Sequence, residues 1–350
     1  MMQRRETKQV KVGNVVIGSS APVTVQSMLN VPSTDIEGSV RQSIELEKAG
    51  CEIIRLAVPD MEAVKLIPAI KEKVNVPLVA DIHFDYRLAL ESAEAGIDKI
   101  RINPGNIGSD DRVKAVAKKC IEKNIPVRIG VNSGSLEKEI LAKYGGVTPQ
   151  AMCESAMYHV QLLNKFDFDD IVISIKSSDV EKMVKAYRLM AEMCPYPLHL
   201  GVTEAGTYKM SLIKSCAGIG SLLLDGIGDT IRISMTDEPV REVESAIDLL
   251  SALNLKNDRP QIVACPTCGR TRIDLISTAK EVEEGLKSCR KKIKVAVMGC
   301  VVNGPGEAKD ADIGIAGGDG CAVLFKHGEI IRKISEENIV KELLQEIDKL

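Results

Sequence analysis

Three cysteines near the end of the chain have a spacing that suits metal binding. Cys265 and Cys268 form a C-x-x-C pair on a turn after a short β-rich run, and Cys300 ends the run KVAVMGC. Two strand-to-loop corners that each present thiols can surround a metal ion or an iron–sulfur cluster. A C-x-x-C pair alone is weak evidence, because it also occurs in redox-active and structural settings.

The residues around Cys300 favour iron over zinc without excluding zinc. Zinc sites usually offer a second matching pair of ligands, whereas Cys300 is followed by a Gly-Pro-Gly turn and Glu307. Three thiolates and one other ligand would leave one iron of a cluster with a replaceable position. Our hypothesis is a cluster held by Cys265, Cys268, Cys300 and Glu307, with zinc as the open alternative. The other seven cysteines are expected to be core or surface residues.

Five cations lie at equivalent places, near the carboxyl ends of β-rich runs: Arg55, Arg101, Arg128, Lys176 and Arg232. If these runs are strands of one barrel, the five side chains converge on one pocket, where they need an anion. Guanidinium groups match phosphate oxygens with paired hydrogen bonds, and one phosphate usually takes about two or three donors. Five cations therefore predict a diphosphate or two phosphoryl groups.

Further polar residues occupy the same run ends. Because side chains alternate along a strand, Asn103, Asn132 and Ser234 share a face with the cations that precede them. Asp81 and His83 end another run, and we expect a hydrogen-bonding role for His83, not metal ligation.

Glu204 ends the seventh run, and two roles are open for it. A carboxyl group among cations is normally ionised, and it would then orient them as an ion-pair partner. If it is buried against a substrate phosphate and aliphatic walls, it could instead keep a proton for a leaving group.

Eight β-rich runs alternate with helix-like stretches along most of the chain. The runs cover 22–29, 51–58, 76–84, 98–105, 125–132, 170–177, 196–204 and 229–236, and the helix-like stretches cover 35–49, 61–73, 86–95, 110–123, 148–164, 180–193, 208–224 and 238–253. This order predicts an α/β fold, a TIM-type (β/α)8 barrel. An open doubly wound sheet is the weaker alternative, because no glycine-rich dinucleotide motif follows the first run.

The pattern changes after residue 254. We expect the substrate-binding barrel over 1–254, a linker over 255–261 and a small α+β cluster domain over 262–350. The last segment combines short strands with helices near 274–287 and 337–349.

The composition excludes several classes of function. The net charge of −3 gives no overall field that would recruit nucleic acid or an anionic membrane. No run approaches the ~20 apolar residues that cross a bilayer, and the polar start lacks the apolar core of a signal peptide. We expect a cytoplasmic protein, where ten cysteines do not predict a disulfide framework.

Several long and rare stretches carry a family resemblance: VPLVADIHFDYRLAL, KIRINPGNIG, IPVRIGVNSGSLEK, HLGVTEAG, GIGDTIRIS, ACPTCGRT and MGCVVNGPGEA. Together they run nearly end to end, and the chain resembles the bacterial 4-hydroxy-3-methylbut-2-enyl diphosphate synthase family of the non-mevalonate isoprenoid pathway. The resemblance implies an oxidoreductase that opens the ring of 2-C-methyl-D-erythritol 2,4-cyclodiphosphate reductively, with loss of a hydroxyl as water. It also implies a 4Fe–4S cluster and a flavodoxin or ferredoxin as electron donor.

The resemblance also implies roles for single residues. The family's cluster ligands match Cys265, Cys268, Cys300 and Glu307, and its diphosphate contacts match Arg101, Arg128, Lys176, Arg232 and Ser234. Residues near the reacting hydroxyl and ring oxygens match Arg55, Asn132 and Glu204, with Glu204 as the proton donor. We assign Asp81, His83 and Asn103 to substrate binding as well. The segment SMLNVPSTD departs from the family's Thr-rich pattern, which leaves the conformation of that loop open.

The predicted order of elements has a consequence for assembly. The eighth helix runs from the catalytic end of the barrel back to its other end, ~24 Å for about sixteen residues. A linker of about seven residues spans at most ~25 Å, too little to bring the cluster over the mouth of its own barrel. We predict a head-to-tail homodimer in which each cluster caps the partner's pocket, and the family is similar in this respect.

Two other functions stay open. A zinc-dependent lyase or transferase could use the same cysteines on a phosphorylated substrate. A non-catalytic iron–sulfur electron carrier is the other alternative, although electron transfer needs no cation-lined pocket. The colour of the protein separates zinc from iron, and tight diphosphate binding separates an enzyme from a carrier.

Overall fold

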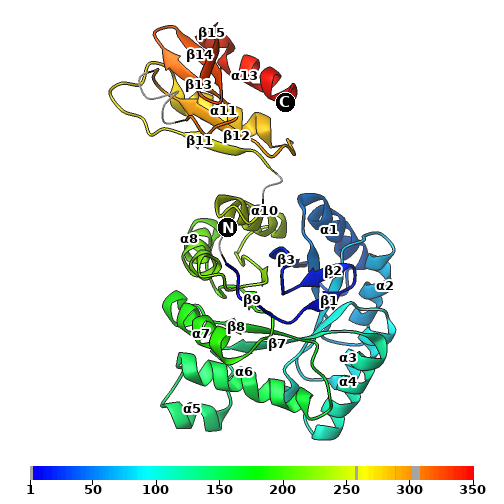
Figure 1. Cartoon of the computed structure of the whole chain (residues 1–350). Helices are drawn as coiled ribbons and strands as arrows, with labels where there is room; N and C mark the ends of the chain where they lie inside the picture. Colours follow the sequence, from blue (N-terminus) through cyan, green and yellow to red (C-terminus); the bar gives the residue numbers. More distant parts are fainter. Residues whose placement is uncertain (1–2, 257–258, 288, 302–307) are drawn as a thin grey trace. The chain divides into compact units, whose positions relative to one another are not determined.

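The computed structural model describes residues 3–256, 259–287, 289–301 and 308–350. It divides into two compact units, residues 1–253 and 254–350. Each unit has a main sheet of its own (Figure 1).

The first unit is a (β/α)8 barrel, which confirms the predicted fold. Its parallel strands neighbour one another in the order β8-β7-β6-β5-β4-β3-β10-β9. A parallel bridge between Ile173 and Leu198 brings β8 next to the start of β9 and nearly closes the ring. The strands are β3 (Thr24–Met28), β4 (Ile53–Ala57), β5 (Leu78–Asp81), β6 (Lys99–Arg101), β7 (Val127–Asn132), β8 (Ile171–Lys176), β9 (His199–Leu200) and β10 (Thr230–Ile231). Each of them lies inside the run that predicted it.

Helices cover the outside of this barrel (Figure 1). They are α1 (Ile36–Ala49), α2 (Leu66–Lys71), α3 (Tyr86–Glu94), α4 (Asp110–Lys123), α6 (Pro149–Asn164), α7 (Val180–Met193), α8 (Tyr208–Ser215), α9 (Ser221–Leu224) and α10 (Pro239–Ala252). Side chains of Asp35, Thr148 and Asp179 cap the first turns of α1, α6 and α7, which explains where these helices begin. The stretch predicted as one helix over 208–224 is interrupted, because the π-helical segment η3 (Cys216–Gly220) separates α8 from α9. The stretch predicted over 61–73 begins as the 3-10 turn η1 (Ala63–Lys65) before α2.

A hairpin that the alternating pattern did not predict precedes the barrel. β1 (Val10–Val12) and β2 (Val15–Ile17) pair antiparallel, and their apolar side chains pack on Ile53, Val79 and Val172 inside the barrel. These three residues lie near the starts of their strands, so the hairpin closes the amino-terminal end. Because side chains alternate, the residues two positions further on, which include Arg55 and Asp81, also face the interior.

Two short elements sit in the loops at the opposite end of the barrel. The 3-10 turn η2 (Pro104–Asn106) follows β6, and the helix α5 (Lys138–Tyr144) lies between β7 and α6. Neither was predicted, since both are shorter than the periodicity that a sequence pattern reveals.

The second unit is a mixed five-stranded sheet with helices, which agrees with the predicted small α+β domain. The strands are β11 (Gln261–Ala264), β12 (Lys294–Met298), β13 (Ile313–Gly318), β14 (Cys321–Lys326) and β15 (Glu329–Ser335), in this order across the sheet. β11, β12 and β13 are parallel, whereas β14 and β15 continue as an antiparallel hairpin. α11 (Leu275–Leu286) and α13 (Ile339–Asp348) contribute to the same apolar core as the sheet.

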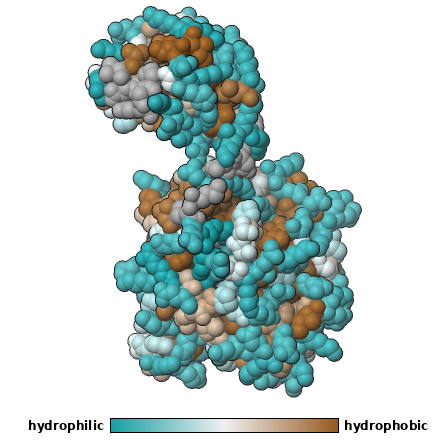
Figure 2. Space-filling model, viewed as in Figure 1, coloured by the Kyte–Doolittle hydropathy of each residue, from teal (hydrophilic) through white to brown (hydrophobic). Residues whose placement is uncertain are grey.

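The visible surface of both units is mostly hydrophilic, with separate hydrophobic patches (Figure 2). Apart from Ala57 at the end of β4, the aliphatic side chains of the barrel strands are buried, as expected for a core without Trp. Within the described residues, no helix has both the length and the apolar character required to cross a membrane.

Candidate active site

The carboxyl ends of three neighbouring strands bring predicted residues into one ion-pair network. Asp81 on β5 lies between Arg55 on β4 and Arg101 on β6. Its Oδ2 accepts a hydrogen bond from Arg55 Nη2 at 2.5 Å, and its Oδ1 accepts one from Arg101 Nη1 at 3.3 Å. All three side chains are buried. One carboxylate therefore balances two of the predicted cations.

The pKa values of this network follow from burial and charge together. Burial by itself would raise the pKa of Asp81, but the charges of Arg55 and Arg101 outweigh it and lower this pKa to about 2. Burial lowers the pKa of Arg55 to about 10, although Asp81 opposes the change. Asp81 is therefore ionised and Arg55 protonated at neutral pH.

Arg128 and Lys176 add positive charge next to this network. Arg128 on β7 is fully buried, and none of its guanidinium nitrogens has a hydrogen-bond partner among the described residues. Burial, followed by repulsion from Arg55 and Arg128, lowers the pKa of Lys176 well below its usual value. Buried cations without partners are costly, so this arrangement favours an anionic ligand. The structure places Arg128 beneath the mouth of the barrel and not on its open surface.

Gly130 on β7 organises two of the predicted binding residues. Its carbonyl oxygen accepts from Arg101 Nη2 at 2.7 Å and from Asn103 Nδ2 at 3.0 Å, and its N–H donates to Asn103 Oδ1 at 2.8 Å. A Cβ atom at this position would lie 2.5 Å from Arg101 Nε, so the close approach requires glycine. The Asn103 amide is therefore already hydrogen-bonded at both ends, which makes it a support for the mouth.

A cavity of about 360 Å³ opens beside this network. It is lined by His83, Phe84, Arg101, Asn103, Asn106, Asn132 and Ser135. The structure thus brings four predicted residues together and adds Phe84, Asn106 and Ser135, which sequence reasoning missed. The last two belong to loops after β6 and β7, and their only sequence signal was a place inside the family-like stretches.

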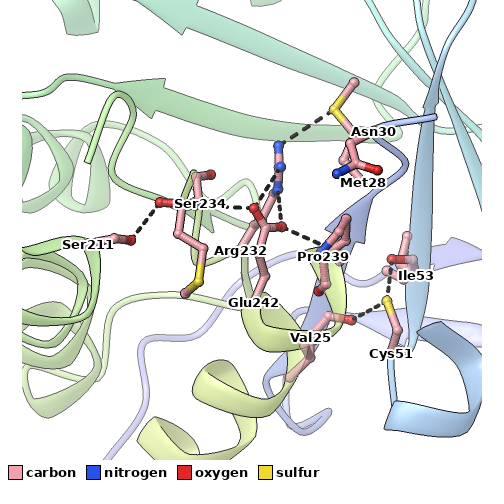
Figure 3. Close-up of polar contacts among 12 residues, drawn as sticks. Val25, Met28, Asn30, Cys51, Ile53, Ser211, Arg232, Ser234, Pro239 and Glu242 are labelled. Carbon is pink, nitrogen blue, oxygen red and sulfur yellow. Dashed lines mark hydrogen bonds and ion pairs between the residues drawn. The ribbon is translucent and has the colours of Figure 1, made fainter. Parts of the chain in front are cut away.

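Arg232 differs from the other predicted cations because it has a partner of its own. Glu242 on α10 receives two hydrogen bonds from Arg232, Nε to Oε2 and Nη2 to Oε1, both 3.1 Å long (Figure 3). The same carboxylate accepts from Ser27 Oγ at 2.9 Å and from the Met235 N–H at 3.2 Å. Glu242 is buried, and sequence reasoning missed it because it lies on a helix and not at a strand end.

Ser234 lies on the same segment as Arg232, and its backbone oxygen accepts from Ser211 Oγ on α8 at 2.7 Å (Figure 3). This contact fixes the chain beyond β10, while Ser234 itself stays half-buried.

Glu204 follows β9 and has an unusual backbone. Its φ is 51°, the left-handed region that non-glycine residues rarely occupy. Such a conformation is costly and is concentrated at functional sites, where it aims a side chain. Glu204 is exposed in this structure, so the buried environment considered for a proton donor is not seen around it.

The interior of the barrel below the mouth contains polar groups that were not predicted. Lys99 on β6 and His199 on β9 are almost completely buried, and Lys99 Nζ and His199 Nε2 have no hydrogen-bond partner among the described residues. Burial, and next the charge of Arg128, lowers the pKa of both groups well below the usual value. Alternation could have predicted that Lys99 faces the barrel interior, because Lys99 lies two residues before Arg101 and therefore on the same face of the strand.

The predicted cysteines lie at one edge of the second unit. β11 and β12 are parallel neighbours, so Cys265 and Cys300, which follow them, are at the same end of the sheet. The N–H of Gly299 donates to Cys265 Sγ at 3.2 Å, and the Arg272 N–H donates to the Gly299 carbonyl at 2.9 Å. Cys268 is exposed on the turn that follows β11.

These residues fit an iron–sulfur cluster by their chemistry. Thiolates of such clusters accept backbone N–H groups, as Cys265 does from Gly299. The described side chains do not include three or more grouped His, Cys, Asp or Glu residues at metal-binding distances. Glu307, the predicted fourth ligand, lies outside the described residues.

The first unit is a (β/α)8 barrel with a cation-rich mouth, and the second is a small domain with cysteines at one end of its sheet. Together they define a two-domain protein suited to an anionic substrate. The family described as "GcpE TIM-barrel domain" matches residues 7–247, and "GcpE protein C-terminal domain" matches residues 261–349. The chain belongs to the GcpE family.

Relatives agree with this assignment over their full length. A protein of Clostridium perfringens, named 4-hydroxy-3-methylbut-2-en-1-yl diphosphate synthase (flavodoxin), is 58% identical over 347 residues and covers 99% of both chains. A protein of Fusobacterium nucleatum with the same name is 57% identical, covering 97% of this chain and 96% of its own.

Two solved structures resemble this chain over about 70% of its length. A 3-dehydroquinate dehydratase from Geobacillus kaustophilus has a TM-score of 0.51 at 14% identity, covering 71% of this chain and 100% of its own. A dihydropteroate synthase from Xanthomonas albilineans has a TM-score of 0.50 at 14% identity, covering 70% and 97%. At this identity the likeness concerns the fold only.

Proposed function

We propose that this chain catalyses the reductive ring opening of 2-C-methyl-D-erythritol 2,4-cyclodiphosphate to 4-hydroxy-3-methylbut-2-enyl diphosphate. The observation that carries the proposal is the excess of buried cations at the barrel mouth, where Arg128 has no partner among the described residues and one carboxylate, Asp81, serves two arginines. Such an excess suits a ligand with two phosphoryl groups. The relatives' printed name, a diphosphate synthase, supports the same reaction.

In this proposal the cations hold the cyclic diphosphate. The residues assigned to it are Arg101, Arg128, Lys176, Arg232 and Ser234. Asp81 and Glu242 orient the arginines, since each carboxylate is hydrogen-bonded to at least one of them. Asn103 and His83 complete the wall of the cavity. Substrate binding requires little rearrangement of these side chains, because the supporting contacts exist before the ligand arrives.

The chemistry needs two electrons and a proton. A carbon–oxygen bond of the ring opens towards the phosphate, and the hydroxyl of the neighbouring carbon leaves as water. We assign the proton to Glu204, whose left-handed backbone supports a functional role. Arg55 and Asn132 are assigned to the reacting hydroxyl and ring oxygens, and Asn132 lines the cavity beside Arg101.

We further propose a 4Fe–4S cluster held by Cys265, Cys268 and Cys300, with Glu307 as the fourth ligand. When bound, such a cluster supplies electrons one at a time to the substrate. The hydrogen bond from Gly299 to Cys265 supports this role, because it stabilises the thiolate form that binds iron. The word "flavodoxin" in the relatives' names supports a flavodoxin as electron donor.

The tether between the units supports a head-to-tail homodimer. α10 starts at Pro239, whose carbonyl lies 3.5 Å from Ser27 Oγ on β3, and Ile247 packs near Gly50 before β4. The helix therefore leads the chain to the amino-terminal end of the barrel, away from the mouth. The seven residues that follow 253 span at most ~25 Å. We propose that each cluster domain serves the partner's barrel.

Anaerobic purification followed by an assay of cyclodiphosphate consumption with a chemical reductant tests the proposed function. Cys300→Ala is expected to lose visible absorption near ~400 nm and turnover together. Arg128→Ala is expected to keep the absorption and to lose affinity for the substrate at least tenfold, since a charge-assisted contact is worth about 1.5–3 kcal/mol.

Three outcomes would contradict this function. A Cys300→Ala variant with full turnover would exclude the cysteine site from the reaction. A colourless, air-stable wild-type protein that binds zinc would replace the redox reaction with a lyase or transferase. A coloured protein without affinity for diphosphates would instead be an electron carrier.

A further inference from the structure

His159 on α6 lies between two loops at the mouth of the barrel. Its side chain is 2% exposed, although it is neither at a strand end nor in the cavity wall. The N–H of Gly105 donates to His159 Nδ1 at 3.1 Å, and His159 Nε2 lies 3.0 Å from Glu137 Oε1. One imidazole ring therefore contacts both the loop after β6 and the loop after β7.

These hydrogen bonds define the tautomer of the ring. A backbone N–H can only donate, so His159 Nδ1 must accept and carries no proton. Nε2 then carries the proton and donates it to the Glu137 carboxylate. Both ring nitrogens are used, and each one is used by a different loop.

The two loops are those that complete the cavity. Gly105 belongs to η2, which continues from Asn103 and contains Asn106, and both asparagines line the cavity. Glu137 ends the loop that begins with Asn132 and includes Ser135, and these two residues also line the cavity. The ring thus contacts both of the loops that carry lining residues of the cavity.

Gly105 shows how tightly the ring fits against its loop. A Cβ atom on Gly105 would lie 2.8 Å from His159 Cε1 and 3.1 Å from His159 Nδ1. The backbone can approach the ring this closely only because the residue is glycine. Burial raises the pKa of Glu137, but hydrogen bonds from His159, Ser155 and its own backbone N–H together outweigh burial and lower this pKa to about 2, so the acceptor is ionised at neutral pH.

We propose that His159 is a positioning residue, which holds the loops after β6 and β7 at the spacing that the phosphorylated substrate requires. The inference rests on the proposed function for the identity of the substrate. It adds that affinity for the substrate depends on a residue behind the loops that does not touch it.

Three variants of His159 separate the two contacts. In His159→Asn the side-chain oxygen can replace Nδ1 and keep the hydrogen bond from Gly105, while the hydrogen bond to Glu137 is lost. In His159→Gln the side-chain nitrogen can replace Nε2 and keep the hydrogen bond to Glu137, while the hydrogen bond from Gly105 is lost. His159→Leu loses both. Gln161→Ala, an exposed site on the same helix, is the control.

Steady-state kinetics and hydrogen exchange of the loop amides are the measurements. We expect His159→Leu to raise KM roughly tenfold with kcat changed less than about threefold, because this variant loses both buried hydrogen bonds that hold the loops. Asn and Gln should give intermediate KM values. Amides of 103–107 and 133–137 should exchange faster in His159→Leu, while visible absorption stays at the wild-type level.

An unchanged KM in His159→Leu, or unchanged exchange in both loops, would overturn the proposal. If His159→Leu does not fold, Glu137→Gln at the partly exposed end of the contact decides by the same two measurements. If the wild-type protein does not consume cyclodiphosphate, the proposed function fails, and hydrogen exchange still decides the role of His159.

Discussion

Asp81 shows how much of this site depends on the charge of a single residue. It lies between Arg55 and Arg101 and contacts both, and neither arginine has another carboxylate partner among the described residues. Removing its charge leaves buried guanidinium groups without compensation, which is far more costly than losing an exposed ion pair.

We expect Asp81→Asn to lower the free energy of unfolding by about 3 kcal/mol at pH 7. The pKa of Asp81 is about 2 in the folded protein, below its value in the unfolded chain. The wild-type protein therefore has this stabilisation above pH ~4 and loses about 2 kcal/mol of it as the pH falls to ~2. Urea unfolding between pH 2 and 7 measures the effect, by comparing how much of the free energy of unfolding the wild type and the variant each lose as the pH falls.

Glu181→Gln, which breaks an exposed pair with Lys185, is the control and should change the free energy of unfolding by less than ~0.5 kcal/mol. Equal acid sensitivity of Asp81→Asn and wild type would contradict the argument.

Lys99 is the opposite case, a buried amine that burial destabilises. Its pKa is lowered well below the ordinary value, first by burial and then by Arg128. Between the folded and unfolded pKa the unfolded chain binds the extra proton, so this group makes the protein more stable as pH rises towards ~10.

Lys99→Met should therefore stabilise the protein, by about 1–4 kcal/mol at pH 7, with the gain shrinking towards pH ~10. Denaturant unfolding of both proteins across this pH range measures it. Lys114→Met, at an exposed site on α4, should show no such gain. A destabilised Lys99→Met would mean that the amine has a partner in solution.

At the scale of elements, α10 is tied to the barrel mouth by a polar contact as well as by packing. Glu242 in its first turn binds Arg232 beyond β10 (Figure 3). The same carboxylate also accepts a hydrogen bond from Ser27 on β3. A helix that packs only through apolar side chains could slide by small amounts. The carboxylate fixes its register relative to the two strands.

Glu242→Gln should weaken substrate affinity, because a neutral amide cannot accept both guanidinium hydrogen bonds from Arg232. We expect KM to rise about tenfold and the free energy of unfolding to fall by about 1–3 kcal/mol. Glu244→Gln, an exposed neighbour on the same helix, should leave both unchanged. If KM for Glu242→Gln equals the wild-type value, Arg232 does not depend on this helix.

At the scale of the whole molecule, the direction of α10 is the basis of the proposal that each cluster domain serves the partner's barrel. The chain leaves the barrel at the end opposite the mouth, and few residues follow before β11 begins at Gln261. If each cluster domain serves the partner's barrel, as we propose, activity is a property of two chains, and this can be tested without a structure of the dimer.

A mixture of two inactive variants should recover activity. Lys176→Met disables the barrel mouth and Cys265→Ala disables the cluster, so a mixed dimer keeps one intact pair in trans. Equal amounts that exchange freely should give about one quarter of the wild-type specific activity, because half of the dimers are mixed and each has one working site. The anaerobic rate of substrate consumption by the mixture, compared with the rate of either variant alone, measures the recovery. If the mixture is as inactive as its components, barrel and cluster of the same chain work together.

The sequence by itself determined the fold class and the strand positions, and it predicted the chemical character of both sites. These depend on alternation, on helix periodicity and on the side chains at strand ends, such as Arg55, Arg101 and Cys265, which local patterns reveal. It also predicted that polar residues two apart would share a face.

Only the tertiary structure decided which of these residues have partners. Among the described residues Arg232 is paired with Glu242, whereas the Arg128 guanidinium has no hydrogen-bond partner, and nothing in their local sequence distinguishes them. The hairpin that closes the barrel and the contact of His159 with two loops were missed for the same reason. Each joins segments that are distant in sequence, and burial and charge compensation depend on what those distant segments bring together.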